Sequence, residues 1–508
     1  MKLKDPAVVA SDFESRIVYH SKQTPGYTSW VSFFPGELGR WYLSCEEVTR
    51  PEKPLPKMSR ERWYEVAMPV GYDKSQYLME AVILESDDGM RTWREVSREP
   101  YHYHHSIFQY ATARTRDGRF LRFVSAWHSL DETVRANEIF YESSDNGKTW
   151  RKMPPFHHDH FFSYPHRMRT LRDGTLVLAL PLSPAFGRGT DRPVRTARNL
   201  DAIGEMSMTL WFSYDDGRSW SGPLPIYGGQ VVSETDFVEL SDGNLMCINN
   251  SIFANPGRQI IYREGTRWTP GPLERSRGQT KWGDANQVPE TVAMSKGGVL
   301  VGCMRAGAYS WSDDLGLNWQ RLEGIPEMGP EVYQPWIHCL GGNRFVCAGH
   351  YGADDAIGRK DQHLTLHSFN VEVRRKTRNT RLEVSREYDE AKERWVNVYP
   401  VRLLCDGEPL SGKEIEFWYV EMHKPGYDSW NKTPLEERIK MGGTSLRAVT
   451  DADGIARISL SEYDALEDIR PTIQFVVRFN TDGRYPEYKP VQSLQFEFRL
   501  FHCQDPPL

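Results

Sequence analysis

Three carboxylates and one tyrosine stand where a buried core would place Val or Leu. Glu234, Asp236 and Glu290 each lie at or near the start of a short β-rich segment. Two carboxylates on either side of a sugar are the common arrangement for glycoside hydrolysis. A phenol such as that of Tyr333, with an ordinary pKa of about 10, is a poor nucleophile until a carboxylate withdraws its proton. These residue types suit acid/base chemistry.

Two histidines indicate a second chemistry. His105 and His166 could exchange a proton near neutral pH. Paired with a tyrosine, such a histidine equips a polysaccharide lyase, in which Arg167 or Arg305 would neutralise the carboxylate of a uronate. The residues alone leave hydrolase and lyase open, together with a protein that binds a glycan without catalysis.

Further aromatic and polar residues share this placement and are predicted to bind the substrate. Flat rings suit the C–H faces of a sugar, and convergent polar groups suit its hydroxyl and acid groups. The predicted substrate-binding residues are Arg305, Arg167, Tyr27, Trp30, Trp127, His128, Tyr164, Asn250, Gln334, His350 and Tyr351. No cofactor is expected, and the spacing of the Cys residues predicts no metal site. His157, His158 and His160 with Asp159 could hold a metal ion, but a solvated loop is the preferred interpretation, so no metal site is predicted.

The elements that must position these residues are hairpins. Asp-Gly and Gly-Gly pairs stand between short β-rich runs, and Asp-Gly in that setting is the strongest short-range hairpin signal. The pairs are Asp117-Gly118, Asp173-Gly174, Asp242-Gly243, Gly297-Gly298 and Gly341-Gly342. The candidate site residues fall at the start of the first strand or the end of the second strand of each hairpin. They are therefore expected to meet at one face.

A second turn pattern, Ser-x-Asp-x-Gly-x-Thr-Trp, interleaves with the first. Short Ser and Asp side chains can bond backbone N–H groups a few residues on, and Gly supplies a positive φ. Complete copies occupy 143–150, 213–220 and 312–319. A copy at 86–93 has its Gly one place early, and an incomplete copy lies at 262–268. Recurrence at intervals of about 50–70 residues indicates a repeat architecture.

These turns resemble the Asp-box repeats of the sialidase-like β-propellers, and the resemblance covers residues 15–373. It implies six four-stranded blades around a channel, with the site on the face opposite the Asp boxes. In sialidases an Arg, an Asp box and a nucleophilic Tyr follow one another, as Arg305, the turn 312–319 and Tyr333 do here. The Phe-Arg-Ile-Pro start is absent, and Asn249 or Asn250 stands where a second Arg would fall. The resemblance therefore implies an exo-acting glycoside hydrolase that is not an ordinary sialidase.

The chain is predicted to be all-β and to hold two domains. Residues 1–373 are expected to form a six-bladed propeller, 374–394 a charge-dense linker, and 395–508 a β-sandwich. Turns such as Asp406-Gly407 and Asp453-Gly454 resemble those of immunoglobulin-like modules.

Composition narrows the expected partners. A hydrophobic fraction of 39% and a charged fraction of 26% are ordinary for a globular protein with a sizeable core. The net charge of −6 gives no basic surface for nucleic acid or an anionic membrane. The first residues lack the apolar stretch of a signal peptide, and the seven Cys are scattered. A cytoplasmic protein that binds carbohydrate, and neither nucleic acid nor membrane, is expected.

Overall fold

The computed structural model shows an all-β chain of 508 residues. The described residues are 6–24, 26–49, 78–100, 107–126, 140–153, 161–162, 165–183, 207–229, 235–249, 257–278, 288–304, 309–326, 332–351, 361–391, 393–421, 444–460, 472–493 and 496–499. Strands dominate them, and their one helix is the short 3-10 turn η4 (Tyr227–Gly229). None of their helices is long and apolar enough to cross a membrane.

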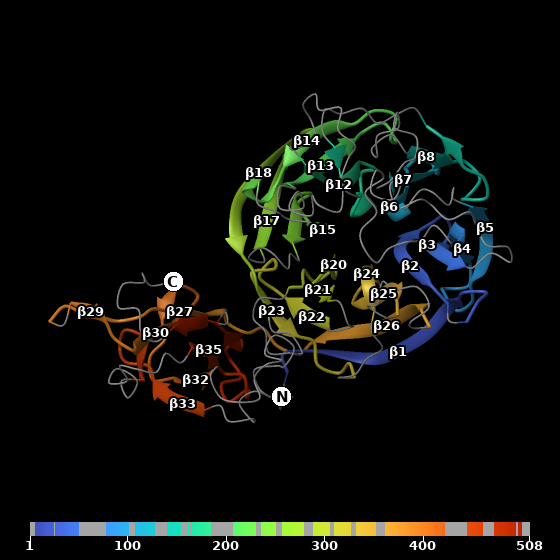
Figure 1. The fold of residues 1–508 in the computed structure, drawn as a ribbon. Helices are drawn as coiled ribbons and strands as arrows, with labels where there is room; N and C mark the ends of the chain where they lie inside the picture. The colour runs from blue at the N-terminus through green and yellow to red at the C-terminus, as the bar shows by residue number, and fades with distance from the viewer. Residues whose placement is uncertain are drawn as a thin grey trace, which may run out of the picture.

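Within the described residues, six sheets surround a common axis (Figure 1), and all their strand pairs are antiparallel except that of β19 with β23, which confirms the predicted all-β propeller. The first sheet holds β2 (Thr28–Pro35), β3 (Trp41–Thr49), β4 (Leu78–Ser86) and β5 (Arg94–Pro100). The second holds β6 (Ile107–Arg114), β7 (Phe120–Ala126), β8 (Phe140–Ser143) and β9 (Arg151–Lys152). The third holds β10 (Phe161–Phe162), β11 (Arg167–Thr170), β12 (Leu176–Ser183), β13 (Ser207–Ser213) and β14 (Ser221–Pro225).

The other three sheets continue the ring. The fourth holds β15 (Thr235–Glu239), β16 (Leu245–Asn249), β17 (Gly257–Glu264) and β18 (Arg267–Arg275). The fifth holds β19 (Arg277–Gly278), β20 (Thr291–Met294), β21 (Leu300–Cys303), β22 (Tyr309–Ser312) and β23 (Asn318–Arg321). The sixth holds β24 (Tyr333–Gly341), β25 (Arg344–His350), β26 (His363–Val373) and β1 (Val8–His20). The count of six blades for the whole of residues 1–373 stays a prediction.

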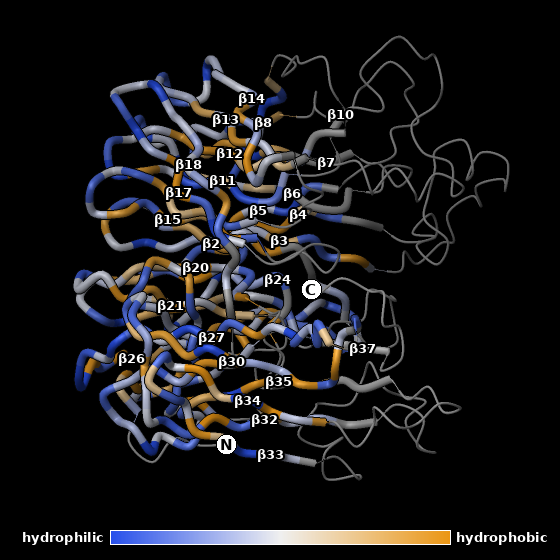
Figure 2. Tube along the Cα trace, turned by 90° about the vertical axis from the view of Figure 1, so that its left-hand side faces the viewer, coloured by the Kyte–Doolittle hydropathy of each residue, from blue (hydrophilic) through white to orange (hydrophobic). Residues whose placement is uncertain are grey.

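Each sheet packs face to face on its neighbours. In β12, Val177 and Ala179 enter a core shared with the fourth sheet, whereas Leu176, Leu178 and Leu180 enter a core shared with the second. Successive side chains of a strand point to opposite faces, so a strand buried on both faces reads as a continuous apolar run. Seen from the side, the hydrophilic segments gather at turns and the apolar ones within strands (Figure 2).

The N-terminal strand closes the ring. β1 pairs antiparallel with β26, from Val8 opposite Val373 to His20 opposite His363. The hairpin turns and Ser-x-Asp turns that mark the other sheets in the sequence do not indicate this pairing. A pairing between strands so far apart in the chain leaves no local signal, because no turn joins them.

Two kinds of turn share one face of the ring. The Asp-Gly and Gly-Gly turns join the first two strands of a sheet, and the Ser-x-Asp turns at 86–93, 143–150, 213–220 and 312–319 join the last two. In an antiparallel meander both lie at the same end, called here the turn face; the opposite end is the loop face. The strands nearest the axis, β2, β6, β11, β15, β20 and β24, are called the inner strands (Figure 1).

The four Ser-x-Asp turns contain the same hydrogen bonds. In 143–150, Ser143 Oγ donates to Asp145 Oδ1 (2.8 Å), and the N–H of Gly147 donates to Ser143 Oγ (2.9 Å). The N–H and Oγ1 of Thr149 both donate to the Asp145 carboxylate (2.9 and 2.6 Å). In the copy at 86–93, Met90 takes the place of the glycine with a φ of 68°. The predicted local chemistry of these turns is confirmed.

Replacing Asp145 with Ala should lower the free energy of unfolding by about 1–2 kcal/mol, because the turn loses its central acceptor. Chemical denaturation of both proteins measures the difference. Catalytic turnover per folded molecule should not change, because the turn lies away from the loop face. A variant of unchanged stability and abolished turnover would contradict this assignment of the two faces.

The C-terminal region consists of two facing sheets and a short hairpin. One sheet holds β27 (Thr380–Val384), β30 (Val398–Cys405), β31 (Glu408–Pro409) and β34 (Ile455–Ser459). The other holds β32 (Glu414–Glu421), β33 (Thr444–Val449), β35 (Thr472–Phe479), β36 (Val491–Gln492) and β37 (Phe496–Arg499). The hairpin pairs β28 (Tyr388–Asp389) with β29 (Arg394–Trp395). Side chains of both sheets share one core, as a β-sandwich requires.

The predicted linker is wrong in part. Residues 380–384 form β27, which pairs with β30 and places Leu382 in the shared core between two solvent-facing charged residues. A charge-dense segment can form such a strand because alternate side chains face solvent. The immunoglobulin-like character and the outer domain boundaries stay predictions.

The sandwich contacts the turn face of the fifth sheet. The buried ammonium group of Lys489 pairs with Asp313 and lies 3.7 Å from the carboxylate of Asp314. Gln320 Nε2 donates to the carbonyl of Pro490 (2.5 Å). A Ser-x-Asp turn thus serves as a docking point for the second domain.

Candidate functional site

Strand register brings the predicted site positions together in pairs. The start of an inner strand lies opposite the end of the second strand, as in Thr28 with Glu47, Thr235 with Asn249, and Tyr333 with His350. These positions all lie at the loop face. The sequence-based rule for collecting them is therefore consistent with the sheet topology.

Many of the predicted site residues stay predictions. His105, Trp127, His128, Tyr164, Glu234, Asn250 and Arg305 lie outside the described residues. Trp30 and Tyr333 belong to β2 and β24, but their side chains also lie outside the described part. The proposed trio of Tyr333, Arg305 and Glu234 is therefore untested.

Asp236 is the centre of a cluster of charged residues near the axis. Its carboxylate accepts two hydrogen bonds from Arg169, through Nε (2.9 Å) and Nη2 (2.6 Å). It also accepts from Thr291 Oγ1 (2.6 Å), the N–H of Val292 (3.0 Å) and the N–H of Phe237 (2.8 Å). Although burial raises the pKa of Asp236, Arg169 and Arg167 hold it well below its ordinary value. With its lone pairs taken by five donors, this carboxylate suits a positioning role better than the predicted acid/base role.

Arg167 crosses the axis from the third sheet to the sixth. Its Nη2 donates to the carbonyl of Pro335 (2.7 Å), and its Nε lies 3.8 Å from Asp236 Oδ1. The guanidinium carbon lies 4.5 Å from the ring centre of Trp336. Arg167 is fully buried, and burial lowers its pKa to about 10, so the group stays charged at neutral pH. The predicted substrate-binding arginine is thus a fixed positive charge at the axis.

Glu290 is a second buried carboxyl of this cluster, and its pKa is raised. It directly precedes the inner strand β20 and is buried. Burial is the largest influence and raises its pKa to about 8; the charge of Arg167 lowers the pKa and that of Asp236 raises it. Two carboxyls whose environments push their pKa values apart are the usual signature of acid/base assignment. At neutral pH Glu290 is a neutral acid beside an ionised Asp236.

The axial cluster, defined as Arg167, Arg169, Asp236, Glu290 and Thr291, therefore carries an excess of positive charge. Two guanidinium groups face one ionised carboxylate when Glu290 is protonated. A buried excess charge is costly unless a counter-charge reaches it. The cluster is electrostatically suited to an acidic ligand.

His166 is tied to the neighbouring sheet. Its Nδ1 lies 2.6 Å from the carbonyl oxygen of Thr235 and 3.1 Å from the Thr235 nitrogen. A ring nitrogen so placed is engaged with backbone, so proton exchange with a substrate would have to use Nε2. The predicted catalytic role of His166 stays a prediction, restricted to that atom.

Four other predicted residues lie at the loop face. Tyr27, Gln334 and His350 are buried, and Gln334 adopts a φ of 51°, in the left-handed region, at the start of β24. A non-glycine residue in that region is uncommon and often marks a functional or constrained position. The ring of Tyr351 stacks on His363 with centroids 4.8 Å apart.

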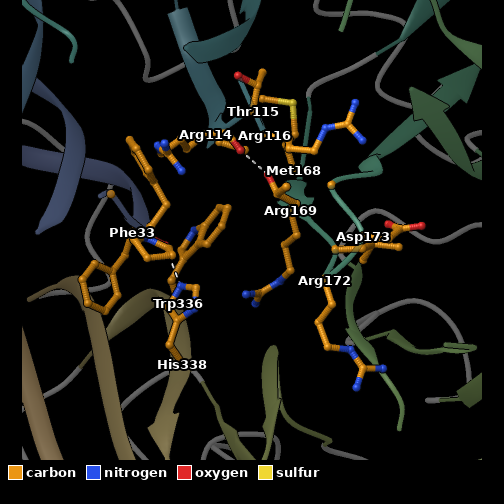
Figure 3. A pocket seen from close by; sticks show the side chains of 17 residues that line it. Phe33, Arg114, Thr115, Arg116, Met168, Arg169, Arg172, Asp173, Trp336 and His338 are labelled. Carbon is orange, nitrogen blue, oxygen red and sulfur yellow. Dashed lines mark hydrogen bonds between the residues drawn. The ribbon is translucent and has the colours of Figure 1, made fainter. Parts of the chain in front are cut away.

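A pocket of 460 Å³ opens at the other end, on the turn face (Figure 3). The inner strands of the first, second, third and sixth sheets and their turns line it. Arg169 and Trp336 belong both to its lining and to the surroundings of Asp236. The sequence predicted no site on this face.

Sequence reasoning missed Arg169, Thr291 and Trp336. The signal for Arg169 was its spacing: residues two apart on a strand share a face, so Arg167 and Arg169 point the same way. Thr291 follows Glu290 and reads as an ordinary strand residue. No group of three or more His, Cys, Asp or Glu within the described ranges is placed to hold a metal ion.

No protein-family model and no curated protein matches this chain. Among solved structures, a protein of unknown function from Dyadobacter fermentans is 15% identical, with 72% of this chain and 100% of that chain covered and a TM-score of 0.47. A Hadza microbial sialidase is 14% identical, covering 67% and 65%, with a TM-score of 0.42. The GH93 α-L-arabinofuranosidase of Fusarium graminearum is 11% identical, covering 70% and 98%, with a TM-score of 0.46. Similarity at this level leaves the reaction open.

Proposed function

We propose that the protein is a carbohydrate-active enzyme whose loop face binds an acidic glycan and cleaves a glycosidic bond with Glu290 as proton donor. The observation that carries the proposal is the environment of Glu290, a buried carboxyl whose pKa burial raises to about 8, and on which the charges of Arg167 and Asp236 act in opposite directions. A carboxylic acid kept neutral at pH 7 is what protonation of a leaving oxygen requires.

The other parts of the site fit this role. Asp236 holds Arg169 through two hydrogen bonds and lies close to Arg167, so the positive charge is fixed before substrate arrives. That charge would attract the carboxylate of an acidic sugar. Departure of the leaving group needs a second group on the opposite side of the sugar, and Tyr333 with Glu234 stays the predicted candidate for it.

A lyase acting on a uronate is the second candidate. His166 stands beside Arg167 at the loop-face end of β11, and the excess positive charge of the axial cluster would stabilise the anion formed when a proton leaves the carbon next to a carboxylate. In that reaction the bond breaks by elimination and leaves a double bond in the sugar. In the hydrolase reaction, water instead adds to the anomeric carbon of the sugar whose bond is cleaved.

One assay separates the two. The protein is incubated with aryl glycosides of neutral and acidic sugars and with uronate polymers, while released phenol and the absorbance of an unsaturated uronate are followed. Phenol release without the unsaturated product supports the hydrolase; the unsaturated product supports the lyase. If neither product forms with any acidic substrate, the proposed reaction is refuted, and binding without turnover indicates a glycan-binding protein.

The pH dependence should follow Glu290. Because its carboxyl donates a proton, kcat/KM should be high below the pKa and fall as the pH rises through about 8. Steady-state rates between pH 5 and pH 10, at constant ionic strength, measure this limb. A rate that keeps rising above about pH 9 would show that the essential group must be deprotonated, contrary to the assignment of Glu290 as the acid.

A further inference from the structure

The turn-face pocket opens at the end of the ring opposite the loop face and shares Arg169 with the axial cluster. Arg114, Arg116, Arg169 and Arg172 contribute to its lining, and in Figure 3 Trp336 lies on the side opposite Arg116 and Arg172. These arginines come from the second and third sheets, and the first and sixth sheets complete the wall. Four arginines therefore line one cavity of 460 Å³.

At three of these arginines the positive group is the more exposed member of its ion pair. The side chain of Arg116 is 63% exposed and its partner Asp216 8%. That of Arg172 is 60% exposed and its partner Glu239 13%. That of Arg169 is 14% exposed, whereas Asp236 is fully buried. The carboxylates therefore lie beneath the guanidinium groups, so the pocket presents positive charge.

The acidic groups near the pocket do not reverse this pattern. Asp173 is the acidic residue of the lining, and it accepts a hydrogen bond from Arg263 (2.5 Å). Arg114 pairs with Glu37, which is the more exposed partner in that case. His338 is neutral, since burial lowers its pKa to about 3, and its Nε2 bonds the carbonyl of Phe33 (2.7 Å).

The position of Arg116 is set by the neighbouring turn. A Cβ added at Gly174 would lie 2.8 Å from Cδ of Arg116, so the stem of the arginine runs directly over this glycine. Gly174 also has a φ of +89°, which favours glycine. Among the described residues, the guanidinium group of Arg116 makes one ion-pair contact, at 3.6 Å, and an arginine has five N–H donors. Within this part of the chain, most of its donors are therefore available to a ligand.

We infer that this pocket binds a compact, multivalent oxyanion, a phosphate or sulfate group, on the face opposite the glycan site. Planar guanidinium groups with N–H donors match the oxygens of such groups better than those of a neutral ligand. The ligand would lie above the ion pairs and contact Arg116 and Arg172 first. Arg169, deeper in the pocket, would extend the positive lining to the axis.

The test is calorimetric titration of the whole protein with pyrophosphate, inorganic phosphate, sulfate and acetate at matched ionic strength. The variants are Arg116→Gln and the double variant Arg116→Gln/Arg172→Gln. Arg94→Gln is a matched control, because Arg94 is also an exposed arginine over a buried carboxylate, that of Glu85, but lies outside the pocket. Pyrophosphate should bind the wild type and the control equally, and the double variant at least about tenfold more weakly.

Three results would overturn the inference. They are the absence of saturable binding of any multivalent anion by the wild type, equal affinities in wild type and double variant, and an equal loss in Arg94→Gln. Acetate binding as tightly as pyrophosphate would refute the preference for multivalent oxyanions. The single variant Arg116→Gln is a control for folding, because Arg116 is exposed and its ion pair with Asp216 is long, at 3.6 Å. Its melting temperature should match that of the wild type.

Discussion

Turnover of an accepted substrate should fall about 10²–10⁴-fold in Glu290→Gln, while substrate binding changes little. Gln has nearly the same shape as the protonated carboxyl that Glu290 presents at neutral pH, but it cannot release a proton. The measurement is kcat and KM for both proteins on the substrate that the screen identifies. Glu85→Gln is the control, because Glu85 is a buried carboxylate of β4 that Arg94 and Tyr42 bond near the turn face.

The control should lose stability and keep its turnover per folded molecule. An aryl glycoside with a good leaving group should partly restore the rate of Glu290→Gln, because such a group needs less protonation. Full activity of Glu290→Gln on a substrate with a poor leaving group would exclude Glu290 as the acid. Another residue of the loop face would then have to donate the proton.

The pH dependence of stability gives an independent measure of the protonation of the Glu290 carboxyl. The folded-state pKa of Glu290, about 8, lies above its ordinary value of 4.5. The stability that this raised pKa contributes is therefore complete below about pH 4.5 and is lost as the pH rises through about 8. Denaturation at several pH values should show the wild type losing stability relative to Glu290→Gln across this window. Parallel curves would show that the carboxyl is not protonated at neutral pH.

Replacing Asp236 with Asn should destabilise the protein by about 3–5 kcal/mol, the usual cost of removing one member of a buried ion pair. Two guanidinium groups, one of them fully buried, would lose their shared counter-charge, and Thr291 its acceptor. Urea denaturation measures the change. Adding Arg169→Gln should recover part of the loss, because the double variant removes one of the uncompensated charges.

This result separates the positioning role of Asp236 from the acid/base role expected from the sequence. Replacing a positioning residue lowers the stability of the fold, and turnover then falls because the arginines are misplaced. If Asp236→Asn folded with wild-type stability and lost turnover, the carboxylate would belong to the chemistry after all.

Local chemistry made much of the fold predictable. Each Ser-x-Asp turn specifies its own hydrogen bonds, so four residues suffice to indicate it, as Ser143, Asp145, Gly147 and Thr149 do. Ring closure by β1 was not predictable in this way, because the pairing depends on a partner over 300 residues distant. Strand β27 was missed because the charged residues Arg381 and Glu383 stand on either side of the buried Leu382 and obscure the alternating pattern.

In the candidate site, too, local features could be predicted from the sequence, and contacts between distant segments could not. Counting from hairpin turns placed Arg167, Asp236 and Glu290 correctly at the loop-face ends of the inner strands. The sequence could not show that Asp236 accepts five hydrogen bonds, since its donors come from three sheets. Arg116 and Arg172 flank tight turns and read as solvated residues, so a pocket that gathers them is visible only in three dimensions.

Closure of the ring by β1 has a consequence for synthesis of the protein. Val8 leaves the ribosome long before its partner Val373, and at about 5–20 residues per second the interval is roughly 20–70 s. Throughout that time the nascent chain carries an unpaired edge strand, which invites contact with chaperones or with other chains. A message truncated before β26 would yield an open arc of sheets instead of a shorter ring. The ring can therefore close only after β26 has left the ribosome.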